Sequence, residues 1–423
     1  MTLAATFLGG AKSRLLPPSL PFRFFVAAAV FHIALWIVLI IAGEEAVSFR
    51  GGLGPALAAV HLLTLGVLTT TAIGAAVQLL PVATRRALAA VWPIRLVFWL
   101  TVPGLIVLIA GMCAYDPLVL IVGAVATTAG LLLFAGLLAD NLRRGGSLQV
   151  VAAYGWAAFV ALIALVVLGL ALSIDFETGF LDDHAAVALA HMILGGFGFM
   201  GMLALGFSHV LVPMFALSSA PAKRPAYAAF AAAVVAIAFG AAGALRGSAP
   251  ILTVAGLIGL GAVIAHLWLM RIALSTGMRK RLGLSFVLVR AAWACLLLTP
   301  LIGLAALYDW AGPNGATLFG LVLLGGWLMT FLFGILQRII PFLASMHVTQ
   351  PKGAPPLLSE LAAEGPLTVH AVCHGIGVVG LAAAIILDNG MIVRGAAGIG
   401  LIGAFAFAVF TGDVVRRLIA RRT

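Results

Sequence analysis

The sequence has 423 residues, of which 64% are hydrophobic and 9% are charged, and its mean hydropathy is +1.22. A soluble domain has no core that could bury so much apolar surface, so these values exclude an ordinary globular protein and indicate an integral membrane protein. The formal net charge is +11. The basic residues lie between the hydrophobic runs and form no single basic face, which argues against a nucleic-acid partner.

Twelve apolar runs have about the 20 residues that a helix needs to cross a bilayer roughly 30 Å thick. In chain order they are 22–43, 54–81, 92–113, 117–140, 148–173, 184–214, 225–245, 250–272, 284–308, 314–342, 366–388 and 391–411. The many Gly and Ala residues are typical of helices that pack closely in lipid. The sequence therefore predicts an all-α integral membrane protein with about twelve transmembrane helices in a single membrane domain, 1–423, with the lipid bilayer as its first partner.

The positions of the charges predict the orientation. If the N-terminus is inside, all of the 24 Lys and Arg residues except Arg50, Arg246 and Arg394 fall in cytoplasmic segments or at cytoplasmic helix ends. The outer loop between the fifth and sixth runs is acidic instead, with Asp175, Glu177, Asp182 and Asp183. This is the positive-inside pattern, so we expect a multi-pass protein of a bacterial-type inner membrane with both termini in the cytoplasm.

The pattern Gly-x7-Gly-x6-Pro occurs near the inner end of three even-numbered runs. Its three copies are Gly66, Gly74 and Pro81; Gly198, Gly206 and Pro213; and Gly326, Gly334 and Pro341. Four runs separate one copy from the next, which preserves orientation and predicts three parallel four-helix repeats at about 1–145, 146–280 and 281–423. Each glycine pair either lets a neighbouring helix approach closely or leaves room for a flat ligand, and close packing is the favoured interpretation for the glycines alone.

Two histidines within the membrane are the leading candidates for chemistry, because imidazoles in hydrocarbon usually have a partner or a function. His61 and His191 lie at similar depths in the second and sixth runs, which are equivalent in the predicted repeats. Two facing imidazoles can hold a haem iron, and Gly66, Gly195 and Gly196 would leave space for the porphyrin. Haem b is therefore expected, with copper as one alternative and a simple hydrogen bond to a neighbouring helix as another.

A second group of polar residues is expected toward the inner side: His209, Gln337, His370 and His374. The last two stand four residues apart on one helical face, as two-histidine metal ligation requires. The group could bind a second metal or haem or conduct protons, but a hydrogen-bonded helix contact is the favoured interpretation. The remaining histidines are assigned to solvated or capping roles, and the methionines of the sixth run to packing: His32, His184, His266, His347, Met192, Met200, Met202 and Met214.

The histidine segments HLLTLGVLTTTAIGAAVQLLP and HMILGGFGFMGMLALGFSHVLVP, together with the threefold helix order, resemble subunit I of haem-copper oxidases and nitric oxide reductases. In size the chain is more similar to NnrS-like membrane proteins. The resemblance implies that His61 is a haem ligand and that His191, or less closely His209, lies on the span that supplies a copper ligand. Run 225–245 has no histidine and run 314–342 offers Gln337 where that family has paired haem histidines, so a complete oxygen-reducing centre is not expected.

The sequence thus predicts a haem-binding, or alternatively copper-binding, protein of respiratory redox chemistry or nitric oxide handling, with other membrane or redox subunits as candidate partners. Whether it is an enzyme stays open. One alternative is a secondary transporter or channel, in which the inner polar group forms a pathway. The other is a non-catalytic assembly or sensory subunit.

Overall fold

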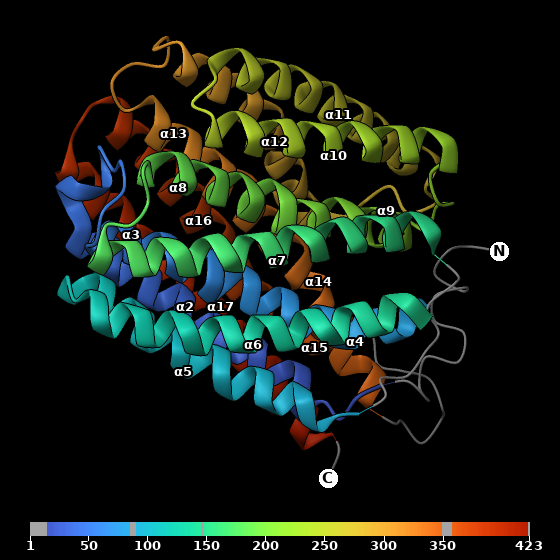
Figure 1. Ribbon diagram of the computed structural model, residues 1–423. Coiled ribbons are helices and arrows are strands. Elements are labelled where there is room, and N and C mark those ends of the chain that lie inside the picture. The colour runs from blue at the N-terminus through green and yellow to red at the C-terminus, as the bar shows by residue number, and fades with distance from the viewer. Residues whose placement is uncertain (1–14, 85–89, 145–147, 349–357, 422–423) are drawn as a thin grey trace.

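The computed structural model describes residues 15–84, 90–144, 148–348 and 358–421, and within these ranges every element is helical (Figure 1). Twelve helices of the described chain are long and apolar enough to cross a membrane, as the sequence predicts. Nine of these spans are single helices: α2 (Ser19–Ala42), α5 (Trp92–Ala114), α6 (Pro117–Arg144), α7 (Gln149–Thr178), α10 (Lys223–Leu245), α11 (Ala249–Thr276), α12 (Gly283–Leu307), α16 (Glu364–Ile386) and α17 (Gly390–Ala420). The first span extends beyond α2 through the short helix η2 (Gly43–Ala46), whereas the short helix α15 (Leu358–Leu361) lies outside the spans.

The other three spans change their winding midway. Each begins as an α-helix, continues through eight residues of π-helix and ends as an α-helix. They are α3–η3–α4 (Pro55–His61, Leu62–Thr69, Thr70–Thr84), α8–η4–α9 (His184–Ile193, Leu194–Gly201, Met202–Ala216) and α13–η5–α14 (Gly315–Leu321, Val322–Met329, Thr330–His347). A π-helical turn widens the backbone and occurs mostly in short pieces, often beside functional sites.

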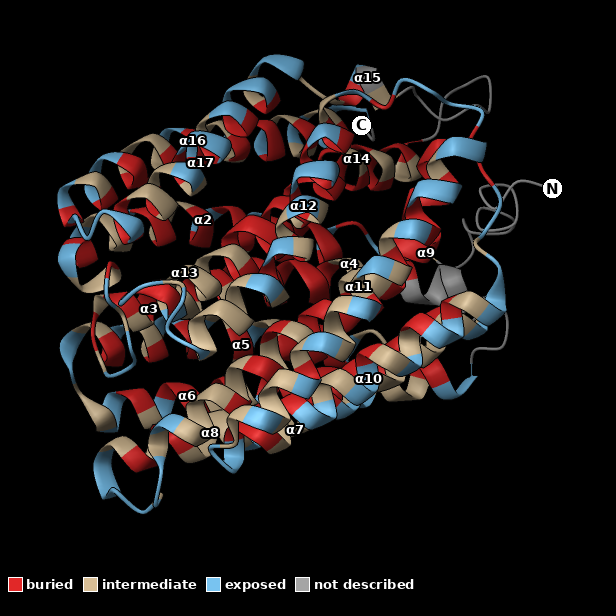
Figure 2. Ribbon diagram, turned by 90° about the horizontal axis from the view of Figure 1, so that it is seen from above, coloured by how far each residue is buried: buried red, intermediate tan, exposed pale blue. Residues whose placement is uncertain are grey.

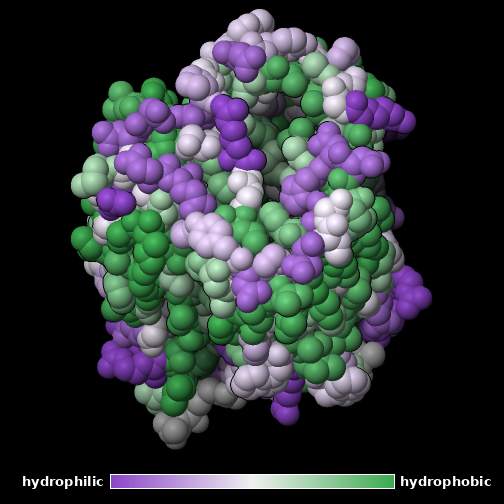
Figure 3. All heavy atoms as spheres, turned by 60° about the vertical axis from the view of Figure 1, so that its left-hand side comes forward, coloured by the Kyte–Doolittle hydropathy of each residue, from purple (hydrophilic) through white to green (hydrophobic). Residues whose placement is uncertain are grey.

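The π-helical segments meet in the interior of the bundle. In α3–η3–α4, 72% of the most apolar stretch is buried, and in α13–η5–α14 the share is 67%, against 17% in α11. Thr69 of η3 contacts the sulfur of Met200 in η4, and Gly196 of η4 packs against Leu323 of η5. Figure 2 shows exposed residues along the outer faces of α10, α11 and α16, and Figure 3 shows hydrophilic side chains gathered on one face of the molecule with hydrophobic side chains along its flanks. The outer helices therefore shield a central group of three from lipid.

The three π-helical segments begin at residues 62, 194 and 322, so their spacings of 132 and 128 residues equal those of Pro81, Pro213 and Pro341. The glycine pairs belong to the same spans. A Cβ added to Gly66 would lie 2.8 Å from the Phe31 Cβ of α2, and one added to Gly206 would lie 2.7 Å from the Tyr154 Cβ of α7. Each such glycine lets the preceding span approach closely, which is the packing role favoured from sequence.

The first and last spans lie side by side and close the bundle. A Cβ at Gly400 of α17 would meet the Trp36 indole of α2 at 2.4 Å, and the backbone N–H of Gly390 donates to Glu44 Oε2 over 3.1 Å. The end of α2 thus lies beside the start of α17, so these two helices run antiparallel. The start of α2 and the end of α17 are therefore at the same end of the molecule.

Candidate functional site

His61 and His191 face each other, although 130 residues separate them. His61 ends α3 just before η3, and His191 lies in the last turn of α8 before η4. Their ring centroids are 6.5 Å apart, and the ring planes are inclined by 30°. The sequence prediction that these residues approach each other is correct, and the central position of the two π-helical spans is the reason.

The two imidazoles are anchored in the same way. His61 Nδ1 lies 3.0 Å from the carbonyl oxygen of Leu57, one turn earlier, and His191 Nδ1 lies 3.1 Å from the carbonyl oxygen of Leu165 in α7. A carbonyl accepts, so each Nδ1 carries the proton and donates it, which leaves each Nε2 unprotonated with a free lone pair. Histidines that bind metals characteristically use one ring nitrogen for such an orienting hydrogen bond and the other for the metal.

A cavity of about 150 Å³ adjoins both rings. Gly195 and Gly196 are among the residues that line it, and they pack against Leu165 and Leu323. Gly66 does not line the cavity. It packs against Phe31 of α2, which an added Cβ would meet at 2.8 Å. Gly169 of α7 lies directly beneath His191, since an added Cβ would meet the ring Cε1 at 2.9 Å. Three methionines also line the cavity, Met112, Met192 and Met200.

The separation of the two rings suits a shared metal ion. Two imidazoles that bind one ion from opposite sides, each through a nitrogen about 2 Å away, have ring centres about 6 Å apart. The observed 6.5 Å is close to this distance. The donor set is two neutral imidazoles in apolar surroundings, with thioethers nearby and no carboxylate in the lining, which suits haem iron or copper better than a hard cation.

The second predicted group does not form as expected, because the structure divides it. His370 and His374 of α16 lie 5.6 Å apart, ring centroid to ring centroid, and their neighbour is His32 of α2, 5.8 Å from His370. The sequence assigned His32 to a peripheral role, which is wrong: it accepts a 2.9 Å hydrogen bond from the Trp36 indole and is 1% exposed. The packing of α2 against α17, which closes the bundle, brings His32 close to His370 and His374. No local pattern in the sequence predicts this contact.

His209 lies elsewhere, against Tyr154 of α7 and His266 of α11, with ring centroids 5.6 and 5.4 Å away. His266 was also expected near an interface, yet it is 1% exposed, and neither of its ring nitrogens has a hydrogen-bond partner. Gln337 is buried, and its Nε2 atom is likewise unpaired.

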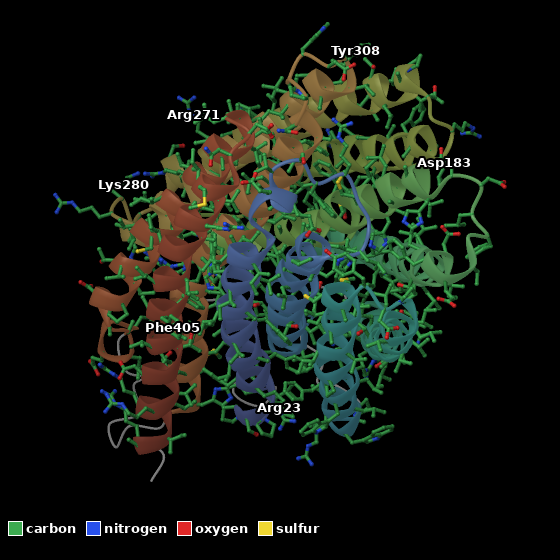
Figure 4. The ribbon with its side chains drawn as sticks, turned by 90° about the vertical axis from the view of Figure 1, so that its left-hand side faces the viewer. Arg23, Asp183, Arg271, Lys280, Tyr308 and Phe405 are labelled. Carbon is green, nitrogen blue, oxygen red and sulfur yellow. The ribbon has the colours of Figure 1, made fainter. Side chains whose placement is uncertain are left out.

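His184 and His347 have the peripheral roles predicted for them. His184 Nδ1 lies 2.7 Å from Asp175 Oδ2, and His347 bridges the carbonyl oxygens of Leu343 and Leu16. Asp183, which projects from the rim of the molecule in Figure 4, accepts a hydrogen bond from the Ala186 N–H and caps α8. Two of the four acidic residues of this loop, Asp175 and Asp183, are therefore engaged in local hydrogen bonds.

Within the described ranges, no group of three or more His, Cys, Asp or Glu side chains is placed to hold a metal ion. Comparison of the chain with models of protein families gives no match, and comparison with curated protein sequences gives none either.

Proposed function

We propose that the protein binds haem b between His61 and His191 and serves respiratory redox chemistry or nitric oxide handling in a bacterial-type inner membrane. The observation that carries the proposal is the paired orientation of the two imidazoles. They face each other at 6.5 Å, and each donates its Nδ1 proton to a backbone carbonyl so that Nε2 is free. Bis-histidine ligation needs these features from residues on two different helices.

The polypeptide supplies orientation and an apolar environment. Gly195 and Gly196 line the cavity beside the rings, and aliphatic side chains such as Leu68 and Leu131 form most of the remaining wall. The 150 Å³ cavity is smaller than the roughly 300 Å³ of a typical ligand site, so porphyrin insertion requires side chains of this wall to change rotamer. Haem iron would contribute one-electron chemistry or nitric oxide binding, tuned by this low-dielectric surrounding.

Copper is the second candidate ligand. A single copper ion fits the 150 Å³ cavity without rearrangement, and Met112, Met192 and Met200 add soft thioether donors to the two imidazoles. These methionines were assigned to packing from sequence, and their common border on one cavity is the observation that favours a copper site. Both candidates use His61 and His191 as ligands, so one experiment separates them.

We also infer that the twelve spans are three related quartets with both termini in the cytoplasm. The equal spacing of the π-helical segments and of the prolines supports the repeat, as does the packing of each glycine pair against the preceding span. The distribution of Lys and Arg supports the orientation. In this arrangement His61 and His191 come from equivalent spans of neighbouring quartets, so the candidate site lies where two quartets meet.

An absorbance spectrum with metal analysis tests the proposal. We expect the purified chain to contain iron and show a Soret band, and we expect His61→Ala and His191→Ala each to abolish it. His184→Ala is the matched control, because this half-buried histidine bonds Asp175 and does not line the cavity, so its loss should leave the spectrum intact. Colourless protein that contains copper, lost in Met200→Leu, would select the copper alternative. Protein without either metal, even after reconstitution, would refute both.

A further inference from the structure

A second and larger cavity lies on the other side of the α8–η4–α9 span. Its volume is about 320 Å³, and it is enclosed by the central spans on one side and by α10, α11 and α12 on the other. The wall contributed by α10 and α11 consists largely of small residues, among them Ala233, Gly240, Gly259 and Ala262. Small residues on two neighbouring helices leave open the volume that larger side chains would fill.

The cavity is long and has one polar end. It extends along α11 from Leu252 to His266, a distance of about 21 Å at 1.5 Å per residue. At the His266 end two polar side chains meet the cavity, those of His266 and Tyr154. Both ring nitrogens of His266 are buried without a partner, a costly state for a polar group unless something binds there.

Charge is absent from this wall. None of the lining residues is Asp, Glu, Lys or Arg, and Arg271, one turn beyond His266 on α11, projects away from the bundle (Figure 4). A bound fatty acid or phospholipid headgroup would therefore bring an unpaired charge into an apolar chamber, which is strongly unfavourable. The occupant that suits this wall is electrically neutral.

Aromatic rings form another part of the wall. Phe197 lies 6.0 Å from Trp327 and 6.3 Å from Phe319, ring centroid to ring centroid, with interplanar angles of 35° and 31°. All three border the cavity. Such a group presents flat surfaces against which a planar ring can pack. The outer walls α10, α11 and α12 carry exposed apolar side chains such as Val234, Leu257 and Leu298, so these three helices separate the cavity from the lipid.

From these features we propose that this cavity binds a neutral, lipid-soluble molecule with a planar ring and a carbonyl oxygen, of the quinone class. The carbonyl oxygen accepts a hydrogen bond from His266 or from the Tyr154 hydroxyl, and the ring and its apolar substituent occupy the length of the chamber. The inference is independent of the haem site, because His61 and His191 line the other cavity.

The test uses the full chain in detergent and the naphthoquinone menadione as probe, with binding measured by calorimetry. We expect saturable binding that weakens by about tenfold or more in His266→Leu, which removes the hydrogen-bond donor, and that is largely restored in His266→Gln. Ala233→Leu fills the chamber and should abolish binding. Ala238→Leu adds the same side chain to the lipid-facing side of α10 and should leave binding unchanged.

Decanol and phosphatidylglycerol serve as competitors that lack the planar carbonyl ring or carry a charge. We expect neither to displace menadione. Decanol binding as tight as that of menadione, or menadione binding that survives both Ala233→Leu and His266→Leu, would overturn the proposal. Thermal unfolding of each variant separates loss of binding from loss of fold. A colourless, iron-free protein that still binds menadione would refute the haem assignment and leave this one intact.

Discussion

Replacing Gly169 by alanine provides a sharp test of the candidate site, because this glycine supports a proposed ligand without being one. An added Cβ would lie 2.9 Å from His191 Cε1 and 3.4 Å from Nδ1. To restore an ordinary contact of about 3.4 Å or more, the imidazole must move about 0.5 Å away from α7. Leu165, whose carbonyl accepts the Nδ1 hydrogen bond, belongs to the same helix.

The movement therefore lengthens that hydrogen bond as well. Starting from 3.1 Å, a displacement of this size takes the Nδ1 to oxygen distance to about 3.6 Å, beyond a useful hydrogen bond. Loss of an orienting partner of a metal-binding histidine typically lowers affinity by about 10-fold to 100-fold. We expect the dissociation constant for haem to rise by this factor in Gly169→Ala, equivalent to about 1.4 to 2.7 kcal/mol.

The assay is titration of metal-free protein with haem, followed by the Soret absorbance. Gly136→Ala on α6 is the control, because nothing lies within 4 Å of the added Cβ and haem affinity should not change. Melting temperatures of both variants report any general loss of structure. A dissociation constant for Gly169→Ala within twofold of the wild type would show that the position of His191 does not govern haem binding.

Three further predictions concern the scaffold. Gly400→Ala places a Cβ 2.4 Å from the Trp36 ring and should lower stability by about 1–3 kcal/mol, seen as a lower melting temperature, whereas Gly398→Ala on the same helix meets nothing and should have no such effect. Arg338→Lys should lower the free energy of unfolding, measured with denaturant, by about 1–2 kcal/mol. The guanidinium lies over the rings of Phe215 and Phe286, 5.4 Å from each centroid, and an ammonium group cannot make both contacts. An unchanged free energy of unfolding would refute this. Asp183→Ala removes the cap of α8 and should cost about 1 kcal/mol, measured as faster amide exchange in its first turn, and unchanged exchange would contradict the capping role.

The number of spans could be predicted from sequence because the bilayer imposes a length on each apolar run. The run 92–113 corresponds to α5 (Trp92–Ala114), and 225–245 to α10 (Lys223–Leu245), with comparable agreement elsewhere. The π-helical turns could not be predicted, because η3, η4 and η5 differ in composition and a wide turn is stabilised by tertiary contacts more than by local propensity. Their regular spacing was nevertheless present in the sequence as the spacing of Pro81, Pro213 and Pro341.

The contacts of the histidines likewise include some that the sequence predicts and some that it does not. His61 and His191 could be paired because both precede a Gly-x7-Gly-x6-Pro segment, so the repeat itself gave their relative depth. His32 and His370 could not, since their contact depends on the closure of the bundle by its first and last spans. His266 was assigned a solvated or capping role because it lies near the end of the run 250–272, but a helix with one lipid-facing side can bury His266 and expose Arg271 five positions later.

Three clusters of imidazoles lie between spans, and the space beside each cluster distinguishes them. His370 has both ring nitrogens unpaired and is enclosed by the rings of Phe333 and Phe407, with centroids 4.5 and 4.9 Å away, so aromatic contact fills the space that a ligand would need. His266 also has both nitrogens unpaired, but it faces an open chamber suited to an organic ligand that brings its own oxygen. His61 and His191 instead have one nitrogen bonded and one free, and they face each other across a shared cavity. His32 and His374 also have one bonded nitrogen each, with Trp36 and Thr330. The open cavity that both rings border is therefore what distinguishes His61 and His191 as candidate metal ligands.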